Sequence, residues 1–595
     1  MKISVAMRMS VVLAMCVFGD TDSSAREIYV AKTGNDSAAG SQDSPYLTIG
    51  QAAEVAQPGD TVTIRAGTYR EWIKPVRGGT GEEQRITYRA ADGDRVVVKG
   101  SERIDKWMRA EGSAWKVVLP NSIFDNYNPY ALEVSGGWLN YGQWHHRGDV
   151  YLNGRAFYEK KTPEEVEENE QSWHCQVDEH HTTIIANFGS ADPNAELTEI
   201  NFRECLFMPE VTGLSFISVQ GIEFFHAAAN WAPPVIELQT GAIGTRMGKA
   251  WIIENCTVSD VRCVGIILGQ APGGDYDNID RFGSHIVRNN LIRRCGQAGI
   301  AGQRGATRCL IADNLIEDTN YRKEFGGWET AAIKFHQSVD TVIRGNLIRG
   351  VYHQTQGAFG IWMDFGNQGT RITGNIIYNT QAAAIFLEMN HGPTLIDNNV
   401  VIGGGFRSNS ENTVIAHNLL VDMQCEYNSD TKRKSQHFKP HTTILTGTRA
   451  GVPQNDKWYN NIFIRTGLSA VKDAPGFVAD GNLYLEGADK SVFGDEVSVV
   501  QPLDTQFQTI DQPRGTEVRF VSDGEPTLEK TPWVDSDLVG VFPIANQTIE
   551  DRFGNPLRID SDLSGTKRTR PIAGPLAKLK PGVNIIRWTT RVGNN

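Results

Sequence analysis

The chain has 595 residues, and its 58 Lys+Arg and 70 Asp+Glu give a formal net charge of −12 at pH 7. This negative charge argues against a nucleic acid or an anionic membrane as partner, because both are themselves polyanions. Hydrophobic residues make up 40% and charged residues 22%, a balance that excludes a wholly disordered chain.

Residues 1–25 predict a secretory signal peptide, with a basic start, an apolar run over residues 10–19 and small residues before a cleavage site. The mature chain would begin at Arg26 and be exported to the periplasm or the medium. No later apolar run approaches the ~20 residues of a membrane span, so no membrane partner is expected. The remaining seven cysteines contain no CxxC pair, which favours buried thiols over a disulfide framework.

Residues 26–100 predict an N-terminal cap and the first coils of a repeat, with a short helix near Ile49 to Ala56. Residues 101–205 lack the repeat and alternate aromatic-rich strands with charged turns, which favours an inserted β-sandwich-like domain. Within it, His145-His146 and residues 179–181 are predicted to lie in solvated loops, because no third ligand follows at a metal-like spacing.

Residues 206–486 carry a repeated phrase: a β-branched pair, one or two polar residues, Asn, then an apolar pair. The phrase occurs as WIIENCTV, HIVRNNLI, CLIADNLI, TVIRGNLI, RITGNIIY, TLIDNNVV, TVIAHNLL and KWYNNIFI. These segments place Asn255, Asn290, Asn314, Asn346, Asn375, Asn399, Asn418 and Asn461 in one predicted register. The shortest separations, 19 and 24 residues, are typical of a solenoid whose rungs are short strands.

We therefore predict an all-β fold, a right-handed parallel β-helix with an attached β-sandwich-like domain. Leucine-rich repeats need fixed leucines and a helical half, and propeller blades need about 40 residues each. The stacked Asn residues are interpreted as a structural ladder. After Glu486 the register is lost, and residues 487–595 are predicted to be a C-terminal β segment that packs beside the insert.

Aligning the coils reveals a second column, in which a polar residue ends each strand. Its predicted members are Gln270, Gln303, His336, Asp364 and Glu388. Neighbours in such a column lie ~5 Å apart, so Asp364 and Glu388 would match the ~5 to 5.5 Å carboxyl separation of a retaining glycosidase. The alternative is a harmless polar ladder, solvated or neutralised by Lys.

The chemistry of such a pair requires two different acids. One carboxylate attacks the anomeric carbon, and the other group keeps a proton for the leaving oxygen, so their pKa values must differ. Lys334 would project to the same face as His336 and stabilise an ionised Asp364. Glu329 precedes that strand and is a candidate ligand for sugar hydroxyls.

Several phrases resemble the β-xylosidases of glycoside hydrolase family 120 from Ile28 almost to the C-terminus. They include YVAKTG, TYREWIKP, ITYRAADGDRVVVKGSERI, GDVYLNG, HAAANWAPP, IWMDFGNQGTRITGN and FLEMNHGP. The resemblance implies an exo-acting retaining enzyme that releases xylose from the non-reducing end of xylo-oligosaccharides. It also implies that Asp364, in IWMDF, is the nucleophile and that Glu388, in FLEMNHGP, is the general acid/base.

The resemblance points to further contacts with the sugar. The family's His-Glu dipeptide stands here as Trp328-Glu329, so Glu329 carries over and the contact at Trp328 differs. His226 and Trp231, in HAAANWAPP, are candidate walls of the sugar pocket, with buried packing as the alternative. Trp362 has the same strand parity as Asp364 and is expected to face the substrate.

Two other functions remain open from the sequence. A polysaccharide lyase on this fold would use a Lys or Arg base and usually calcium, and a non-catalytic secreted solenoid would only bind carbohydrate. The favoured reading needs no cofactor or metal, takes a xylo-oligosaccharide as its partner, and leaves a homo-oligomer open. A loop with Asp275, Asp277 and Asp280 lacks the Gly and terminal Glu of a calcium loop.

Overall fold

The computed structural model describes residues 25–110, 112–232, 238–269, 276–524, 531–590 and 592. The predicted signal peptide, apart from Ala25, and the predicted column member Gln270 lie outside these residues, as does Asp275. Within the described part, no helix is long and apolar enough to cross a membrane.

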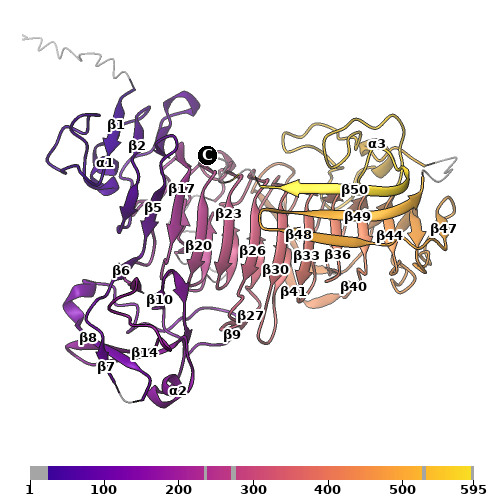
Figure 1. Ribbon diagram of the computed structural model, residues 1–595. Coiled ribbons are helices and arrows are strands. Elements are labelled where there is room, and N and C mark those ends of the chain that lie inside the picture. The colour runs from indigo at the N-terminus through magenta and orange to yellow at the C-terminus, as the bar shows by residue number, and fades with distance from the viewer. Residues whose placement is uncertain are drawn as a thin grey trace, which may run out of the picture.

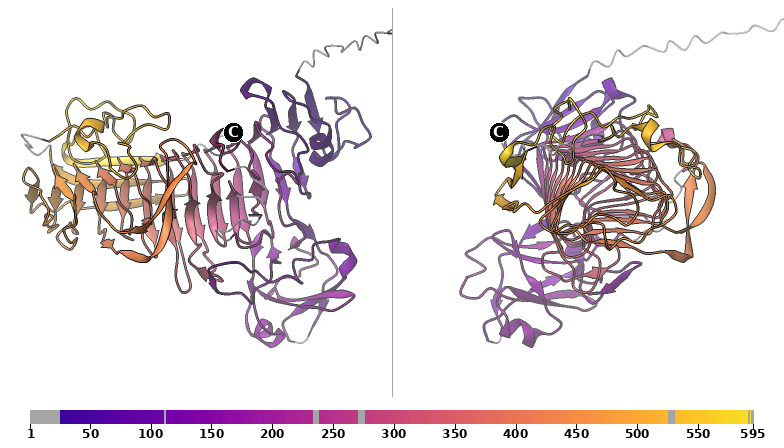
Figure 2. Two further views of the ribbon diagram at one scale, coloured as in Figure 1. Left: turned by 180° about the vertical axis from the view of Figure 1, so that it is seen from behind. Right: turned by 90° about the vertical axis from the view of Figure 1, so that its right-hand side faces the viewer.

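The chain winds into a parallel β-helix, as predicted (Figure 1). One 13-stranded sheet runs from β1 (Glu27–Val30) to β45 (Val478–Asp480), and a second runs from β3 (Gly67–Tyr69) to β47 (Val499–Gln501). The third sheet has eight strands, from β18 (Ile243–Gly244) to β40 (Cys425–Tyr427). Viewed nearly along the axis, the strands of successive coils overlie one another around a continuous apolar interior (Figure 2).

An Asn ladder connects successive coils at the same turn of each coil. Asn346 donates its side-chain Nδ2 to Asn375 Oδ1 at 2.9 Å, and its own Oδ1 accepts from Asn314 at 2.9 Å. The same bonds repeat from Asn290 through Asn461 and extend to Asn482, which the sequence reading missed. The register of Asn255 was wrong by one residue: Cys256 occupies the ladder position, and its backbone N–H donates to Asn290 Oδ1.

A short helix covers the first coil at the predicted place. Helix α1 (Ile49–Val55) begins after Thr48, whose hydroxyl accepts the Gln51 N–H at 3.1 Å and so caps the helix. Ile49, Ala52 and Ala53 are buried against the first strands, so the apolar end of the solenoid is closed.

The predicted insert folds as two sheets around one apolar core, which includes Trp173, Val150 and Ile200. The four-stranded sheet contains β11 (Arg155–Ala156), β10 (Val150–Leu152), β15 (Thr198–Asn201) and β6 (Ser101–Arg103). The five-stranded sheet contains β12 (Tyr158–Glu159), β13 (Ser172–Val177), β14 (His181–Asn187), β8 (Trp115–Pro120) and β7 (Met108–Arg109). Helix α2 (Pro163–Glu168) packs on β13 and β14.

Buried charges join the insert to the solenoid. Arg262, from a coil turn, contacts Glu324 at 2.7 Å and Glu159 of the insert at 2.9 Å. Glu159 also binds His145 at 3.1 Å and His146 at 2.6 Å. The prediction of a solvated loop was therefore wrong for this His pair, because Glu159, from a later strand of the insert, binds both imidazole rings. A second connection is β9 (Leu139–Tyr141), which pairs with β27 (Gly326–Gly327).

The C-terminal segment packs against the solenoid, not beside the insert as predicted (Figure 1). Its sheet consists of β48 (Gln508–Gln512), β49 (Gly515–Asp523) and β50 (Pro581–Thr589). Val518 and Phe520 of β49 share an apolar cluster with Leu347 and Ile376 of the second long sheet. Outward-facing apolar residues of the coils are covered in this way.

A two-stranded hairpin leaves the coil and returns across its face. We call β41 (Asp430–Phe438) and β42 (Leu445–Gly451) the arm. The arm is fixed to the coils by Gln368, which exchanges two hydrogen bonds with the Phe438 backbone at 3.0 and 3.1 Å.

Candidate active site

The predicted polar column is present in the strand register of the third sheet. It runs along β24 (Ala298–Gln303), β28 (Ala331–His336), β31 (Phe359–Asp364) and β34 (Ile385–Glu388). Gln303 pairs with His336, His336 with Asp364, and Asp364 with Glu388. Paired residues on adjacent strands are ~4.8 Å apart, so Asp364 and Glu388 face the same space from neighbouring coils.

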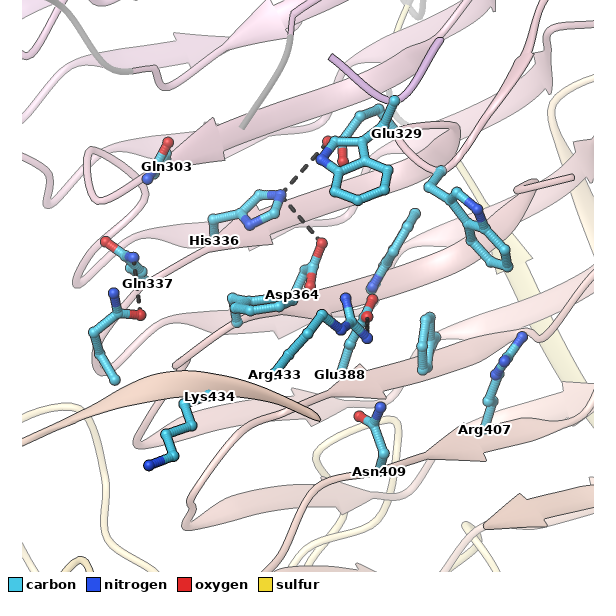
Figure 3. Close-up of a pocket in the computed structure, with 16 residues that line it drawn as sticks. Gln303, Glu329, His336, Gln337, Asp364, Glu388, Arg407, Asn409, Arg433 and Lys434 are labelled. Atoms are coloured by element: carbon cyan, nitrogen blue, oxygen red, sulfur yellow. Dashed lines mark hydrogen bonds and ion pairs between the residues drawn. The ribbon is translucent and has the colours of Figure 1, made fainter. Parts of the chain in front are cut away.

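These strand ends open into a cavity of about 600 Å³ (Figure 3). Its size is that of a small-ligand pocket. The lining consists of Trp138, Gln303, Trp328, Glu329, His336, Gln337, Trp362, Asp364, Phe365, Phe386, Glu388, Arg407, Asn409, Arg433, Lys434 and Gln436.

Lys334 connects two of the acids that line this cavity. Its Nζ is 2.7 Å from Glu329 Oε1 and 2.9 Å from Asp364 Oδ2, and it donates to the Trp328 carbonyl at 2.9 Å. The ammonium also stands 3.2 Å from the centre of the Trp362 ring. Each donor direction of Lys334 is thereby used within the protein, which fixes the side chain.

Asp364 is held through one carboxylate oxygen, and its other oxygen makes no hydrogen bond within the described chain. Oδ2 contacts Lys334, and His336 Nε2 lies 3.2 Å from the same oxygen. Oδ1 is buried and has no hydrogen-bond partner among the described residues. Burial alone would raise the pKa of Asp364, but the positive charges of His336 and Lys334 outweigh it and hold that pKa below 3.8.

Glu388 has the opposite character. Burial and the adjacent charge of Asp364 raise the pKa of Glu388 to about 8, although Lys334 and Arg433 act against this rise. Near pH 7 the site therefore holds an ionised Asp364 beside a protonated Glu388. Chemically similar acids separated in this way are suited to different roles in one reaction.

Other buried polar atoms around the cavity also lack protein partners. In the described part of the chain, Gln303 Oε1 and Trp362 Nε1 are buried without a hydrogen bond. An unpaired buried polar atom costs about 1–3 kcal/mol, so a group of them around one cavity needs an explanation. A ligand with several hydroxyl groups would supply the missing donors and acceptors.

Aromatic rings form one wall of the cavity. Trp362 stacks on Phe386 with ring centres 5.3 Å apart, and Phe359 lies 4.6 Å from Trp362. Trp328 packs edge-on to Trp362 at 6.4 Å. Such a wall can bind the apolar face of a sugar ring.

Comparison with known proteins identifies the family. Residues 104–172 and 164–200 match the model of the glycoside hydrolase 120 insertion domain, and residues 241–420 match that of a right-handed β-helix region. Residues 32–76 match a family described as a protein of unknown function, DUF1565. The solved complex of XylC with xylose is 32% identical, with a TM-score of 0.86, over 94% of this chain and 100% of that chain.

The chain belongs to glycoside hydrolase family 120. The resemblance read from its motifs is thus confirmed, as are the right-handed β-helix and the prediction of a glycoside hydrolase.

Two curated relatives match short segments. Uncharacterized protein YwoF of Bacillus subtilis is 37% identical over 73 residues, which are 12% of this chain and 15% of that protein. Pectate lyase PEL9 of Emericella nidulans is 36% identical over 80 residues, 13% of this chain and 19% of that protein. The chain therefore spans less than a fifth of the length of these two relatives.

Two residues proposed from the family-like phrase HAAANWAPP lie outside the cavity lining. His226 is buried, stacks on Tyr151 at 3.6 Å and shares a hydrogen bond with Ser101 Oγ at 2.8 Å. Trp231 is also buried and donates to the Gly137 carbonyl at 3.1 Å. The alternative of buried packing describes both residues, which hold the insert against the solenoid instead of forming a pocket wall.

Several lining residues were missed by the sequence reading. Arg433, Lys434 and Gln436 come from the arm, and Trp138 comes from the insert. No periodicity relates these segments to the polar column. Asn409 could have been found, because β37 (Phe406–Ser408) pairs with β34 and continues the column past Glu388.

Glu329, His336 and Asp364 are close enough to one another to hold a metal ion. However, the Lys334 ammonium already contacts both carboxylates of this group, at 2.7 and 2.9 Å. A divalent cation there would meet strong repulsion from Lys334, so these donors do not form a favourable metal site.

Proposed function

We propose that this family 120 enzyme is a retaining exo-β-1,4-xylosidase that releases xylose from the non-reducing end of xylo-oligosaccharides. Asp364 would be the nucleophile, and Glu388 would be the general acid/base. The observation that carries the proposal is the direct pairing of these acids on β31 and β34, with pKa values shifted in opposite directions. Adjacent-strand spacing matches the separation of a retaining pair and is too short for an inverting one.

In the first step, Asp364 Oδ1 attacks the anomeric carbon, because Oδ2 is held by Lys334. The glycosidic C–O bond breaks, and its electron pair goes to the leaving oxygen, which takes the proton of Glu388. A xylosyl ester on Asp364 and a shortened oligosaccharide result.

In the second step, a water molecule attacks the same carbon and transfers a proton to Glu388, while the Asp364 carboxylate leaves. The two inversions give net retention of the anomeric configuration. The intermediate prepares Glu388 for this role as a base. Esterification removes the negative charge of Asp364, which is the largest contribution to the raised pKa of Glu388 after burial, so ionisation of Glu388 becomes easier.

The substrate assignment is supported by the XylC structure, which was solved in complex with xylose. Glu329, His336, Trp362 and Trp328 line the cavity and would bind the sugar. The unpaired Gln303 Oε1, Trp362 Nε1 and Asp364 Oδ1 suit the hydroxyl groups of a pyranose. Xylo-oligosaccharide is accordingly the proposed partner.

The test is hydrolysis of 4-nitrophenyl β-xyloside, with NMR detection of the xylose anomer formed first. β-Xylose as the initial product is expected, whereas initial α-xylose would contradict the pairing of Asp364 with Glu388. Asp364→Asn, which is nearly isosteric, should abolish turnover in a protein of unchanged fold. A carbohydrate-binding solenoid would show no hydrolysis at all, and a calcium-dependent lyase would lose its activity on chelation.

Export is part of the proposal, since residues 1–25 have the pattern of a signal peptide. Expression of the full chain in a secreting host should yield a product whose N-terminus is Arg26. Recovery of the intact N-terminus from the cytoplasm alone would contradict export. The mass of the purified protein in solution would decide whether it is a homo-oligomer.

A further inference from the structure

Arg433 contacts the proposed acid/base from outside the coil. Its Nη2 donates to Glu388 Oε1 at 2.6 Å, and the two residues are 45 positions apart in the chain. Both line the same cavity, Glu388 from β34 and Arg433 from the arm (Figure 3). We propose that Arg433 is a positioning residue, which orients the Glu388 carboxyl group and favours its ionised form during the second step. This inference rests on the proposed function.

The arm holds Arg433 in a defined place. Asp430 Oδ2 accepts a hydrogen bond from Arg433 Nε at 2.6 Å, and the guanidinium lies 5.0 Å from the centre of the Phe365 ring. Two residues further on, the buried Ser435 hydroxyl donates to the Met389 carbonyl and lies 2.8 Å from His391 Nε2. Arg433 is therefore held between Asp430 on the arm and Glu388 at the end of β34.

The geometry of the contact leaves one carboxyl oxygen for chemistry. Because Arg433 binds Oε1, rotation of the Glu388 carboxyl group is restricted, and Oε2 remains available for the leaving oxygen or the attacking water. A charge-assisted hydrogen bond of this length is among the strong ones in proteins. Arg also keeps its charge at every working pH, so the restraint persists through both steps.

The charge of Arg433 has a second effect, which differs between the two steps. Burial and Asp364 raise the pKa of Glu388, and Arg433 is one of the groups that limit the rise. A protonated Glu388 is needed in the first step, and removal of the Arg433 charge favours that form. An ionised Glu388 is needed in the second step, where loss of Arg433 should slow the reaction.

The experiment compares Arg433→Met with Lys432→Met, which removes a positive charge from an exposed neighbour on the same strand. With 4-nitrophenyl β-xyloside, whose good leaving group makes the second step limiting, kcat of Arg433→Met should fall about tenfold. The basic limb of its kcat/KM profile should move up by about one pH unit. Arg433→Lys should recover part of both effects, and Lys432→Met should match the unmodified enzyme.

A double-mutant cycle separates positioning from a general structural role. If Arg433 acts through Glu388, Arg433→Met should cause no further loss in a Glu388→Gln background. An equal loss in both backgrounds, or an unshifted pH profile in a variant with normal thermal unfolding, would overturn the inference. If the unmodified enzyme instead gives α-xylose first, or hydrolyses no xyloside, the proposed function itself fails, independently of Arg433.

Discussion

Replacement of Lys334 by Met should destabilise the protein and impair catalysis together. The Lys334 side chain is 2% exposed, and its ammonium lies within 2.9 Å of carboxylate oxygens of both Glu329 and Asp364. Removing it leaves two buried acids without their shared counter-charge. Breaking a buried ion pair in this way costs about 3–5 kcal/mol, so the free energy of unfolding should fall by that amount.

The effect on Asp364 has a definite sign. Its pKa in the folded chain is below 3.8, so its ionisation stabilises the fold above about pH 4, and this contribution is lost as the pH falls through the lowered pKa. Without Lys334 that pKa rises, and the acid limb of the kcat/KM profile should move to higher pH. A loss of about 10²-fold in kcat/KM at neutral pH corresponds to ~2.7 kcal/mol of transition-state stabilisation.

Urea unfolding and pH-dependent hydrolysis of 4-nitrophenyl β-xyloside measure these two effects. Lys472→Met, at an exposed position, is the matched control. The double variant Lys334→Met with Glu329→Gln should recover part of the lost stability, because it removes one of the uncompensated charges. A Lys334→Met protein that loses less than about 1 kcal/mol and keeps its acid limb would refute the reasoning.

Three further predictions follow from the site and the ladder. Glu388→Gln should reduce turnover of xylobiose far more than the rate of the first step with 4-nitrophenyl β-xyloside, because only the poor leaving group of xylobiose needs a proton. Single-turnover kinetics measure that first step, and equal losses with the two substrates would contradict the acid role. The unmodified enzyme should lose kcat/KM above about pH 8, where Glu388 releases its proton, and a flat profile to pH 9.5 would exclude Glu388 as the titrating acid. Asn346→Leu should lower the free energy of unfolding by about 2–4 kcal/mol in urea, because it removes the partners of Asn314 and Asn375; a change within 0.5 kcal/mol would show that the ladder is dispensable.

The β-helix could be predicted because its coils repeat one sequence phrase, whose Asn makes the same ladder bonds in successive coils. The error at Asn255 has a local cause. The segment ENC places Asn one residue before the ladder position, where the backbone takes a left-handed conformation with φ 56°, and Cys256 fills the position itself. The predicted position of the C-terminal sheet was wrong. The outward-facing Leu347 and Ile376 show that some segment must cover them, but their sequence does not specify which segment does so.

The candidate site, like the fold, could be predicted only in part from the sequence. The polar column was accessible from the sequence, because a fixed strand register carries His336, Asp364 and Glu388 onto one face. The arm was not, since Arg433 reaches Glu388 through a hairpin that interrupts the repeat. The phrase HAAANWAPP misled for a related reason: a match to a family motif does not distinguish a sugar contact from a packing residue such as His226.

The parallel coil itself favours retention at this site. Successive members of a column are separated by one strand spacing, ~4.8 Å, and members two coils apart by about twice that distance. A retaining pair therefore needs neighbouring coils, whereas an inverting pair would fit better with one coil between its members. Asp364 and Glu388 are neighbours, and Asn409 follows in the next coil. The backbone thus sets the spacing. The asymmetry between the two acids comes from Lys334 and His336 beside Asp364, and from the burial of Glu388 next to the Asp364 charge.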